Sequence, residues 1–387
     1  MDGLLLPRPT GELSAQPTEG VFLAAEAPSE PFGPTSPAEA GEDNAPSPWW
    51  TPARFADKKP FLLARGRIKT ALRAYLIDQG FTEIEAGQLQ VSPGNETHLH
   101  GLETQVLAPD GTPRPFYLHT SPEFACKKLL AAGETRIFDF ARVFRNREQG
   151  PLHATEFTML EWYRAHQDWH VVMEDCLALV RLAAAAVPTP SLSWRGVEIL
   201  ANSAPIYLRV QDAFTQYAAI DLESTLTDDG EGKCDALADQ ARGSGFAVAP
   251  DDTWSDMFSK ILVEAIEPKL GQTAPTFLTH YPACEAALAR RCADDPRFSE
   301  RFELYVCGVE LANGFGELTD PIEQKKRFEA DMAEKQRIYG ETYPIDLDFL
   351  DALAIMPPAS GVALGFDRLA VLATGARRIE DVLWTLA

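Results

Sequence analysis

Apolar residues return at helical spacing in the first clearly patterned part of the chain. Within residues 59–79 they mark one side of a helix, at Leu62, Leu63, Ile68, Leu72 and Leu76. This periodicity predicts an amphipathic α-helix. A short strand is expected directly after it, around Phe81–Glu85.

A second helix and two strands are predicted in the stretch that follows. Ser121-Pro122-Glu123 offers an N-cap serine and a proline at the first helical position, and Gly133 is expected to end that helix. Runs of apolar and alternating residues predict strands at Arg136–Arg145 and Glu156–Arg164. A long helix is expected to start near Asp168 and to finish in an alanine-rich segment.

The remaining pattern favours one α+β domain over residues 49–387. Residues 190–270 are predicted to mix helix and loop, and the chain then returns to strands. Its last helix is expected to open at Phe366-Asp367-Arg368. Strands that cluster without regular βαβ alternation indicate an antiparallel sheet flanked by helices.

Residues 1–48 differ in composition and are predicted to be a disordered leader. They are rich in Pro, Ala, Glu and Ser, and Arg8 is their one basic residue. Such a segment buries too little apolar surface to offset its ordering entropy. It is either a solvated leader, a segment whose start codon is assigned too early, or a docking tail that uses Leu4-Leu5-Leu6 or Val21-Phe22-Leu23.

Net charge and composition narrow the classes of partner and compartment. The formal charge of −22 argues against extensive tRNA binding, because phosphate contacts require a basic surface. The sequence has no apolar run of membrane-spanning length and no secretory signal, so a membrane protein is not expected. Six cysteines without a C-x-x-C pair favour a reduced cytoplasm and argue against structural zinc.

Two short patterns late in the chain suggest an amino-acid-activation site. Asn313, Phe315 and Glu317 stand at i, i+2 and i+4, so in a strand they share one face. Glu303 and Glu310 flank a glycine turn, and two carboxylates suit a hard cation such as Mg²⁺ that also binds phosphates. A carboxylate for a cationic side chain beside such a site suggests ATP-dependent activation of a lysine-like molecule.

A third pattern lies on the two central predicted strands. Arg145 ends the first, and Phe157, Glu161 and Tyr163 share a face of the second. An arginine fork suits a phosphate or a carboxylate, and an aromatic ring suits a stacked purine. Taken singly, each residue has a simpler explanation, since strand aromatics are usually core and Arg–Glu pairs are usually surface ion pairs.

The order of these segments resembles the class II aminoacyl-tRNA synthetases, in particular their lysyl branch. Phe144-Arg145-Asn146-Arg147-Glu148 and the following His153–Glu161 are similar to motif 2 of that class. Gly361-Val-Ala-Leu-Gly365-Phe-Asp367-Arg368-Leu369 resembles motif 3. Glu310–Glu317 resembles the lysyl signature, and a chance match to three ordered signatures is improbable.

The resemblance implies a role for each residue of the ATP site. Arg145 would hold the α-phosphate and the substrate carboxylate, and His153 and Arg368 would contact the outer phosphates. Phe157 would stack on adenine. By the same resemblance, Glu303 and Glu310 would hold Mg²⁺.

The resemblance also implies a pocket for the amino acid. Glu123 would bind its amino group, and the residues around the distal ammonium would be Glu161, Tyr163 and Glu317. Asn313 and Phe315 would line the space between these two ends.

Lysyl-tRNA synthetases carry an anticodon-binding OB-fold before the catalytic domain, and we expect no such barrel here, because only the predicted leader and a short helical segment precede the resemblance. The resemblance runs from about Phe61 to Trp384. The chain is therefore similar to the elongation factor P lysyltransferases. That family adenylates lysine, preferentially (R)-β-lysine, and transfers it to a lysine ε-amine of elongation factor P. Ala363 stands where the tRNA synthetases usually have glycine; its methyl group either reshapes the pocket or is a tolerated strand alanine.

Two departures from the class pattern leave questions open. Arg147 replaces the class-typical glutamate of motif 2, so the adenine contact is either lost or shifted to Glu148. The motif 1 region, Glu83–Gly87, lacks its usual proline, although a homodimer is still expected. The alternatives are an adenylate-forming paralogue with another acceptor (tRNA, a carrier protein or a small molecule) and a silent lysine-binding regulator. Retention of the phosphate and metal ligands argues against the regulator.

Overall fold

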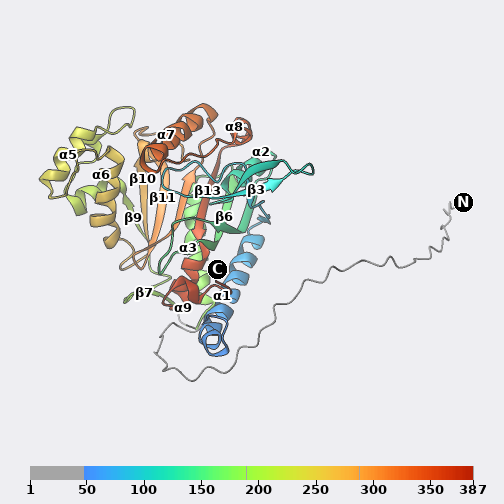
Figure 1. Cartoon of the computed structure of the whole chain (residues 1–387). Helices are drawn as coiled ribbons and strands as arrows, with labels where there is room; N and C mark the ends of the chain where they lie inside the picture. Colours follow the sequence, from blue (N-terminus) through green and yellow to red (C-terminus); the bar gives the residue numbers. More distant parts are fainter. Residues whose placement is uncertain (1–47, 189, 287, 387) are drawn as a thin grey trace, which may run out of the picture. The chain divides into compact units, whose positions relative to one another are not determined.

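The helices and the smaller sheets are arranged around one large β-sheet (Figure 1). The computed structural model describes residues 48–188, 190–286 and 288–386. Within these residues the main sheet has eight strands in the order β1-β5-β6-β13-β12-β11-β10-β9. The pairs β1–β5 and β9–β10 are parallel and the other pairs are antiparallel, which confirms the predicted α+β fold.

The main-sheet strands are β1 (Thr82–Glu83), β5 (Arg136–Phe144), β6 (Glu156–Ala165), β9 (Ile206–Arg209), β10 (Thr276–Pro282), β11 (Phe298–Val306), β12 (Val309–Gly316) and β13 (Ala359–Gly365). Two small sheets contain β2 (Leu89–Gln90), β3 (Leu102–Leu107) and β4 (Pro113–Leu118), and β7 (Ser191–Trp194) with β8 (Val197–Leu200). The α-helices are α1 (Pro52–Asp78), α2 (Glu123–Ala131), α3 (Trp169–Ala185), α4 (Val210–Ala213), α5 (Cys234–Gly243), α6 (Trp254–Ile261), α7 (Pro321–Tyr339), α8 (Leu347–Leu353) and α9 (Phe366–Thr374).

One face of the main sheet is apolar, and α1, α3 and α9 cover it. Phe138, Trp162 and Val362 stand directly opposite one another on β5, β6 and β13. Directly opposed residues share a face, and this row packs into one core cluster with Leu72 of α1 and Leu369 of α9. Each large side chain buried there contributes about 1.5–3 kcal/mol relative to an exposed position. The opposite face is therefore supported from behind by a rigid layer.

Two smaller cores position the elements at the edges of the sheet. On α6, Phe258 stacks on Trp254 and Phe214 at ring-centre distances of 5.2 and 5.0 Å. Phe124 of α2 stacks on Phe349 of α8 at 4.1 Å. The second contact fixes α2, whose first residue is Glu123, against the polar side of the sheet.

A buried ion pair joins α1 to α9 and β6. Arg65 Nε donates to Asp367 Oδ1 at 2.8 Å, and its Nη2 donates to Thr158 Oγ1 at 2.9 Å. The Thr158 backbone N–H donates to Asp367 Oδ2 at 2.7 Å, so both carboxylate oxygens are satisfied. Asp367 is fully buried and Arg65 is nearly so. If one partner were removed, water could not easily solvate the charge that remains.

The structure corrects three predictions about secondary structure. Helix α2 begins one residue later than predicted, so Pro122 rather than Ser121 occupies the N-cap position. The Ser121 hydroxyl accepts a hydrogen bond from the Glu123 N–H at 3.0 Å. Residues 190–270 contain three strands besides helix and loop, and one of them, β9, belongs to the main sheet. The region expected to be strands also contains α7, which Asp320 caps and Gly340 ends in the left-handed conformation.

Other predictions are confirmed or fall outside the description. The turn between β11 and β12 lies at Cys307 and Gly308, both with positive φ, as the glycine predicts. The predicted leader lies outside the described residues, apart from Pro48. Among the helices of the described ranges, none has the length and apolar content needed to cross a membrane.

Replacing Asp367 with alanine should destabilise the protein by about 3–5 kcal/mol, because Arg65 would be left buried without its counter-charge. Urea denaturation of the purified variant measures the change. Asp351→Ala, at an exposed position of α8, is the matched control and should stay within about 0.5 kcal/mol of the wild type. A similar small loss for Asp367→Ala would show that this ion pair does not hold the helices together.

Candidate active site

The register of the main sheet gathers predicted residues into rows on its polar face. One row crosses five strands through directly paired residues: Asp139, Glu161, Ala363, Asn313 and Glu303. The next row contains Ile137, Tyr163, Gly361, Phe315 and Arg301. Opposed side chains share a face, so these groups all lie on the side away from the large apolar core. The predicted common face of Asn313 and Phe315 is confirmed.

A β-bulge brings Glu310 to the same face. Glu303 pairs with Asn313, whereas Tyr305 pairs with Glu310, so Leu311 is an extra residue on β12. In a regular strand, Glu310 would point to the opposite face from Asn313, three residues later. The bulge therefore places both predicted metal ligands on the polar side.

A cavity on this face brings together the residues predicted to bind ATP. Its lining includes Arg145, Glu148, His153, Phe157 and Arg368, with Glu310, Asn313 and Ala363 alongside. The guanidinium carbon of Arg145 lies 5.5 Å from the centre of the Phe157 ring, within the range of a cation–π contact. The cavity thus joins a cation suited to phosphate with an aromatic face suited to a base.

Arg368 and His153 form a fixed pair at the start of α9. Arg368 Nη1 donates to the backbone oxygen of Glu310 at 2.9 Å, and Nη2 lies 2.8 Å from His153 Nε2. A guanidinium can only donate, so Nε2 is the acceptor and the proton of His153 is on Nδ1. Burial and the charge of Arg368 lower the pKa of His153, consistent with a neutral ring. Its remaining N–H can donate to an anion.

Arg147 does not line the cavity. Its φ of 63° lies in the left-handed region, and its guanidinium bonds to Glu341 and stacks 5.8 Å from the Tyr339 ring. This turn of the backbone directs Arg147 toward the end of α7, whereas Glu148 lines the cavity. Of the two interpretations left open by the sequence, the geometry favours a shift of the glutamate by one residue.

A buried lysine that the sequence reasoning missed holds the second part of the site together. Lys127 Nζ lies 2.5 Å from Glu123 Oε1 and 2.6 Å from Glu317 Oε2. Burial alone would lower the pKa of Lys127, but the charges of Glu123 and Glu317 raise it above the usual lysine value. The signal was present in the sequence, because Glu123 and Lys127 stand at i and i+4 of a helix.

Glu161 is hydrogen-bonded, but it forms no ion pair with any residue that the structure describes. The Tyr163 hydroxyl donates to Oε1, and the Ser121 hydroxyl donates to Oε2 at 2.7 Å. Burial, and next the nearby charge of Glu123, raise the pKa of Glu161 to about 8. The empty pocket therefore favours the protonated form of Glu161, and a bound cation would favour the ionised form.

This arrangement, which we call the amine pocket, has a surplus of negative charge. Its carboxylates are Glu123, Glu161 and Glu317, and Lys127 is the cation that pairs with two of them. When all are ionised, the formal surplus is two negative charges. Buried unpaired charge is costly, so the pocket is suited to a ligand with two ammonium groups.

Small and polar groups shape the space beside the amine pocket. A Cβ at Gly361 would lie 2.3 Å from the Tyr163 ring and 2.5 Å from Glu317 Oε1, so the pocket requires glycine there. Asn313 Oδ1 is buried and has no hydrogen-bond partner among the described residues. Such an acceptor costs roughly 1–3 kcal/mol when unsatisfied and marks a place for a ligand N–H. Phe315 is half-buried against the cluster that contains Tyr163.

Glu303 and Glu310 offer oxygen ligands, but no larger metal-binding cluster occurs in the part of the chain that the structure describes. Glu303 already accepts from Arg301 Nη2 at 2.8 Å and from the Tyr305 hydroxyl at 2.7 Å. Glu310 is 3.8 Å from Arg368, its nearest cation. Burial and the charge of Glu303 raise the pKa of Glu310 to about 7. The Glu310 carboxylate is short of positive charge, so it is suited to bind Mg²⁺. Proteins commonly bind this ion through one or two carboxylates, and phosphate and water oxygens complete its coordination.

Comparison with known families matches nearly all of the described chain to one of them. Residues 50–384 match the family tRNA synthetases class II (D, K and N). The match spans both the main sheet and the elements that cover it. It confirms the class II architecture that the ordered motifs predict.

Several curated proteins that share more than a third of their aligned residues with this chain carry the same name. The Elongation factor P--(R)-beta-lysine ligase of Salmonella arizonae is 38% identical over 339 residues, covering 86% of this chain and 96% of that protein. The protein of the same name from Haemophilus ducreyi is 37% identical over 324 residues, covering 83% of this chain and 92% of its own length.

Replacing Gly361 with alanine should weaken the binding of lysine by at least roughly tenfold, because the new methyl group displaces Tyr163 or the Glu317 carboxylate. Isothermal titration calorimetry with the amino acid measures the change. Gly66→Ala in α1 is the matched control, since a Cβ there meets nothing within 4 Å. Unchanged affinity in Gly361→Ala would mean that lysine does not use this pocket.

The ligand-free protein should lose stability as the pH rises from about 5 to about 8. The pKa of Glu161 is raised to about 8 and that of Glu317 to about 7, against roughly 4.3 in an unfolded chain. A carboxyl group with a raised folded pKa contributes stability in full below its unfolded pKa, and this is lost as the pH passes the folded value. Urea denaturation across this range should show a shallower decline for Glu161→Gln. Parallel declines in both proteins would contradict the assignment.

Proposed function

Because this chain belongs to the class II tRNA synthetases (D, K and N), and within them to the family of elongation factor P--(R)-beta-lysine ligases, we propose that it activates lysine or (R)-β-lysine with ATP and transfers it to elongation factor P. The acceptor is a lysine ε-amine of that factor. The intermediate is the aminoacyl-adenylate.

The observation that carries this proposal is the meeting of two complementary sites on one sheet face. The cavity with Arg145 and Arg368 suits phosphates, and the amine pocket suits a dication. Asn313 and Ala363 line the cavity and belong to the same row as Glu161, so the two sites adjoin. A diamino acid could place its ammonium groups in the amine pocket and its carboxylate in the cavity beside Arg145.

Adenylation joins two anions, the substrate carboxylate and the α-phosphate, and releases pyrophosphate. Groups that neutralise them lower the barrier, and no protein nucleophile is needed. Arg145 is assigned to the α-phosphate and the carboxylate, and Arg368 with His153 to the outer phosphates. Phe157 would stack on the adenine, and Glu148 would contact the edge of that base. Glu303 and Glu310 would hold Mg²⁺, which neutralises phosphate charge when bound.

Substrate selection would rest on the amine pocket. Glu123 is assigned to the amino group nearer the carboxylate, and Glu161, Tyr163 and Glu317 to the distal ammonium. An amino acid without a distal amine would leave carboxylates unpaired, which costs on the order of several kcal/mol. Ala363 adds a methyl group beside Glu161 and Asn313, where it could favour a β-amino acid.

The remaining parts of the proposal concern partners and compartment. The formal charge of −22 favours a protein acceptor over extensive tRNA binding. A homodimer is proposed on exposed apolar side chains of α1 and β2 and beside them, namely Leu63, Ile77, Leu89 and Val91. Six free thiols fit a reducing cytoplasm.

The purified enzyme should catalyse ATP–pyrophosphate exchange that depends on lysine or (R)-β-lysine, and should transfer the labelled amino acid to elongation factor P but not to tRNA. The two amino acids are compared side by side, with Ala363→Gly as the matched variant. Removal of the methyl group should shift the ratio of the two exchange rates toward α-lysine, since one methylene-sized change is worth about 10- to 200-fold in a fitted pocket. Efficient charging of tRNA, with no transfer to the factor, would overturn the proposal.

A further inference from the structure

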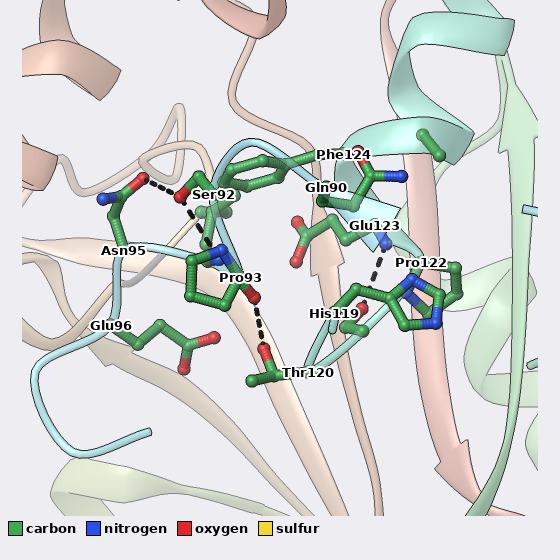
Figure 2. A pocket seen from close by; sticks show the side chains of 14 residues that line it. Gln90, Ser92, Pro93, Asn95, Glu96, His119, Thr120, Pro122, Glu123 and Phe124 are labelled. Atoms are coloured by element: carbon green, nitrogen blue, oxygen red, sulfur yellow. Dashed lines mark hydrogen bonds between the residues drawn. The ribbon is translucent and has the colours of Figure 1, made fainter. Parts of the chain in front are cut away.

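A second opening lies beside the amine pocket (Figure 2). It shares one lining residue with the cavity that contains Arg145 and Phe157, which we call the nucleotide cavity. Its lining includes Ser92, Asn95, His119 and Thr120, together with Glu123 of the amine pocket. Among the described residues that line the two openings, Glu96 is common to both. Glu96 therefore stands at the junction between them.

The loop that carries Glu96 is held on both sides of that residue. Lys335 of α7 is fully buried and donates to the backbone oxygens of Thr97 at 2.9 Å and Leu99 at 2.7 Å. On the other side, the side-chain amide of Asn95 donates to a backbone oxygen at 3.2 Å. These anchors fix the backbone and leave the Glu96 side chain free to face a ligand.

The Glu96 carboxylate has no hydrogen bond or ion pair with any residue in the described ranges. Glu123, Glu161 and Glu317 of the amine pocket each have such a partner. Burial raises the pKa of Glu96 to about 7, although it keeps some surface toward the openings. Among the nearby charges, Arg145 and Arg301 lower the pKa of Glu96. Glu123 and Asp331 raise it further.

Transfer to a lysine acceptor has a requirement that adenylation does not have. The acceptor amine is protonated at neutral pH, with an ordinary pKa of about 10.4, and an ammonium group has no electron pair with which to attack. The carboxylates of the amine pocket would already be engaged by the ammonium groups of the bound amino acid. A free carboxylate close to Arg145, which is assigned to the reacting carboxyl group, is the group available to take a proton.

We propose, as an inference that rests on the proposed function, that the Glu96 carboxylate binds the acceptor lysine ammonium at this junction and takes one of its protons. The freed electron pair forms the C–N bond with the acyl carbon of the adenylate. The bond between that carbon and the phosphate oxygen then breaks, and AMP leaves with the bonding electrons. The attacking nitrogen gives its second proton to the departing AMP, so the products are the amide, AMP and protonated Glu96, which returns its proton to water.

The two half-reactions separate this role from others. Glu96→Gln in the full-length enzyme should keep pyrophosphate exchange with (R)-β-lysine within about twofold of the wild type. Single-turnover transfer from preformed adenylate to elongation factor P should fall by about a hundredfold or more at pH 7, the lower end of the usual range of general-base effects. The deficit should narrow as the pH rises toward the pKa of the acceptor amine, and Glu96→Asp should restore part of the rate.

Glu103→Gln, at an exposed position of β3, is the control and should leave both half-reactions unchanged. Equal loss of exchange and transfer, or a raised KM for the amino acid, would assign Glu96 to the amino group of the substrate and overturn the proposal. Transfer at the wild-type rate and pH dependence would also overturn it. Wild-type enzyme that performs exchange but never transfers to the factor would instead refute the acceptor assignment.

Discussion

The crowding of like charge on one face of the sheet is the constraint that shapes the site. Glu123, Glu161 and Glu317 lie close together in buried surroundings, where an unpaired carboxylate costs several kcal/mol. The fold reduces this cost with the ion pairs of Lys127, with hydroxyl donors to Glu161, and with retained protons. What remains is a surplus of negative charge, which would favour a ligand with two ammonium groups and would also destabilise the empty pocket.

This charge cluster is tolerable because the rest of the sheet is firmly built. The apolar face is packed against α1, α3 and α9, and α2 is fixed by the stack of Phe124 on Phe349. Hydrogen-bond register then sets the relative positions of residues from distant parts of the chain, since opposed residues in an antiparallel sheet share a face. The site therefore depends less on loops than on the pairing of β5, β6, β13, β12 and β11.

Much of this was readable from the sequence where the signal is local. Alternation predicted the common face of Asn313 and Phe315, and the ordered motifs predicted the cavity around Arg145 and Arg368. The position of Glu310 was not readable in the same way, because an extra residue in a strand depends on its partner. Helix α7 was missed because its charged surface gives weak periodicity, although Asp320 and Gly340 signal its ends.

The left-handed conformation of Arg147 has a consequence for how such chains are compared. The side chain of Arg147 is bonded to Glu341, while that of the neighbouring Glu148 lines the cavity, so an alignment made column by column would compare Arg147 and overlook Glu148. In this motif, the path of the main chain decides which side chain faces the cavity, as much as the residue types do. A search that scores identities alone would count a missing glutamate here, although the adjacent Glu148 lines the cavity.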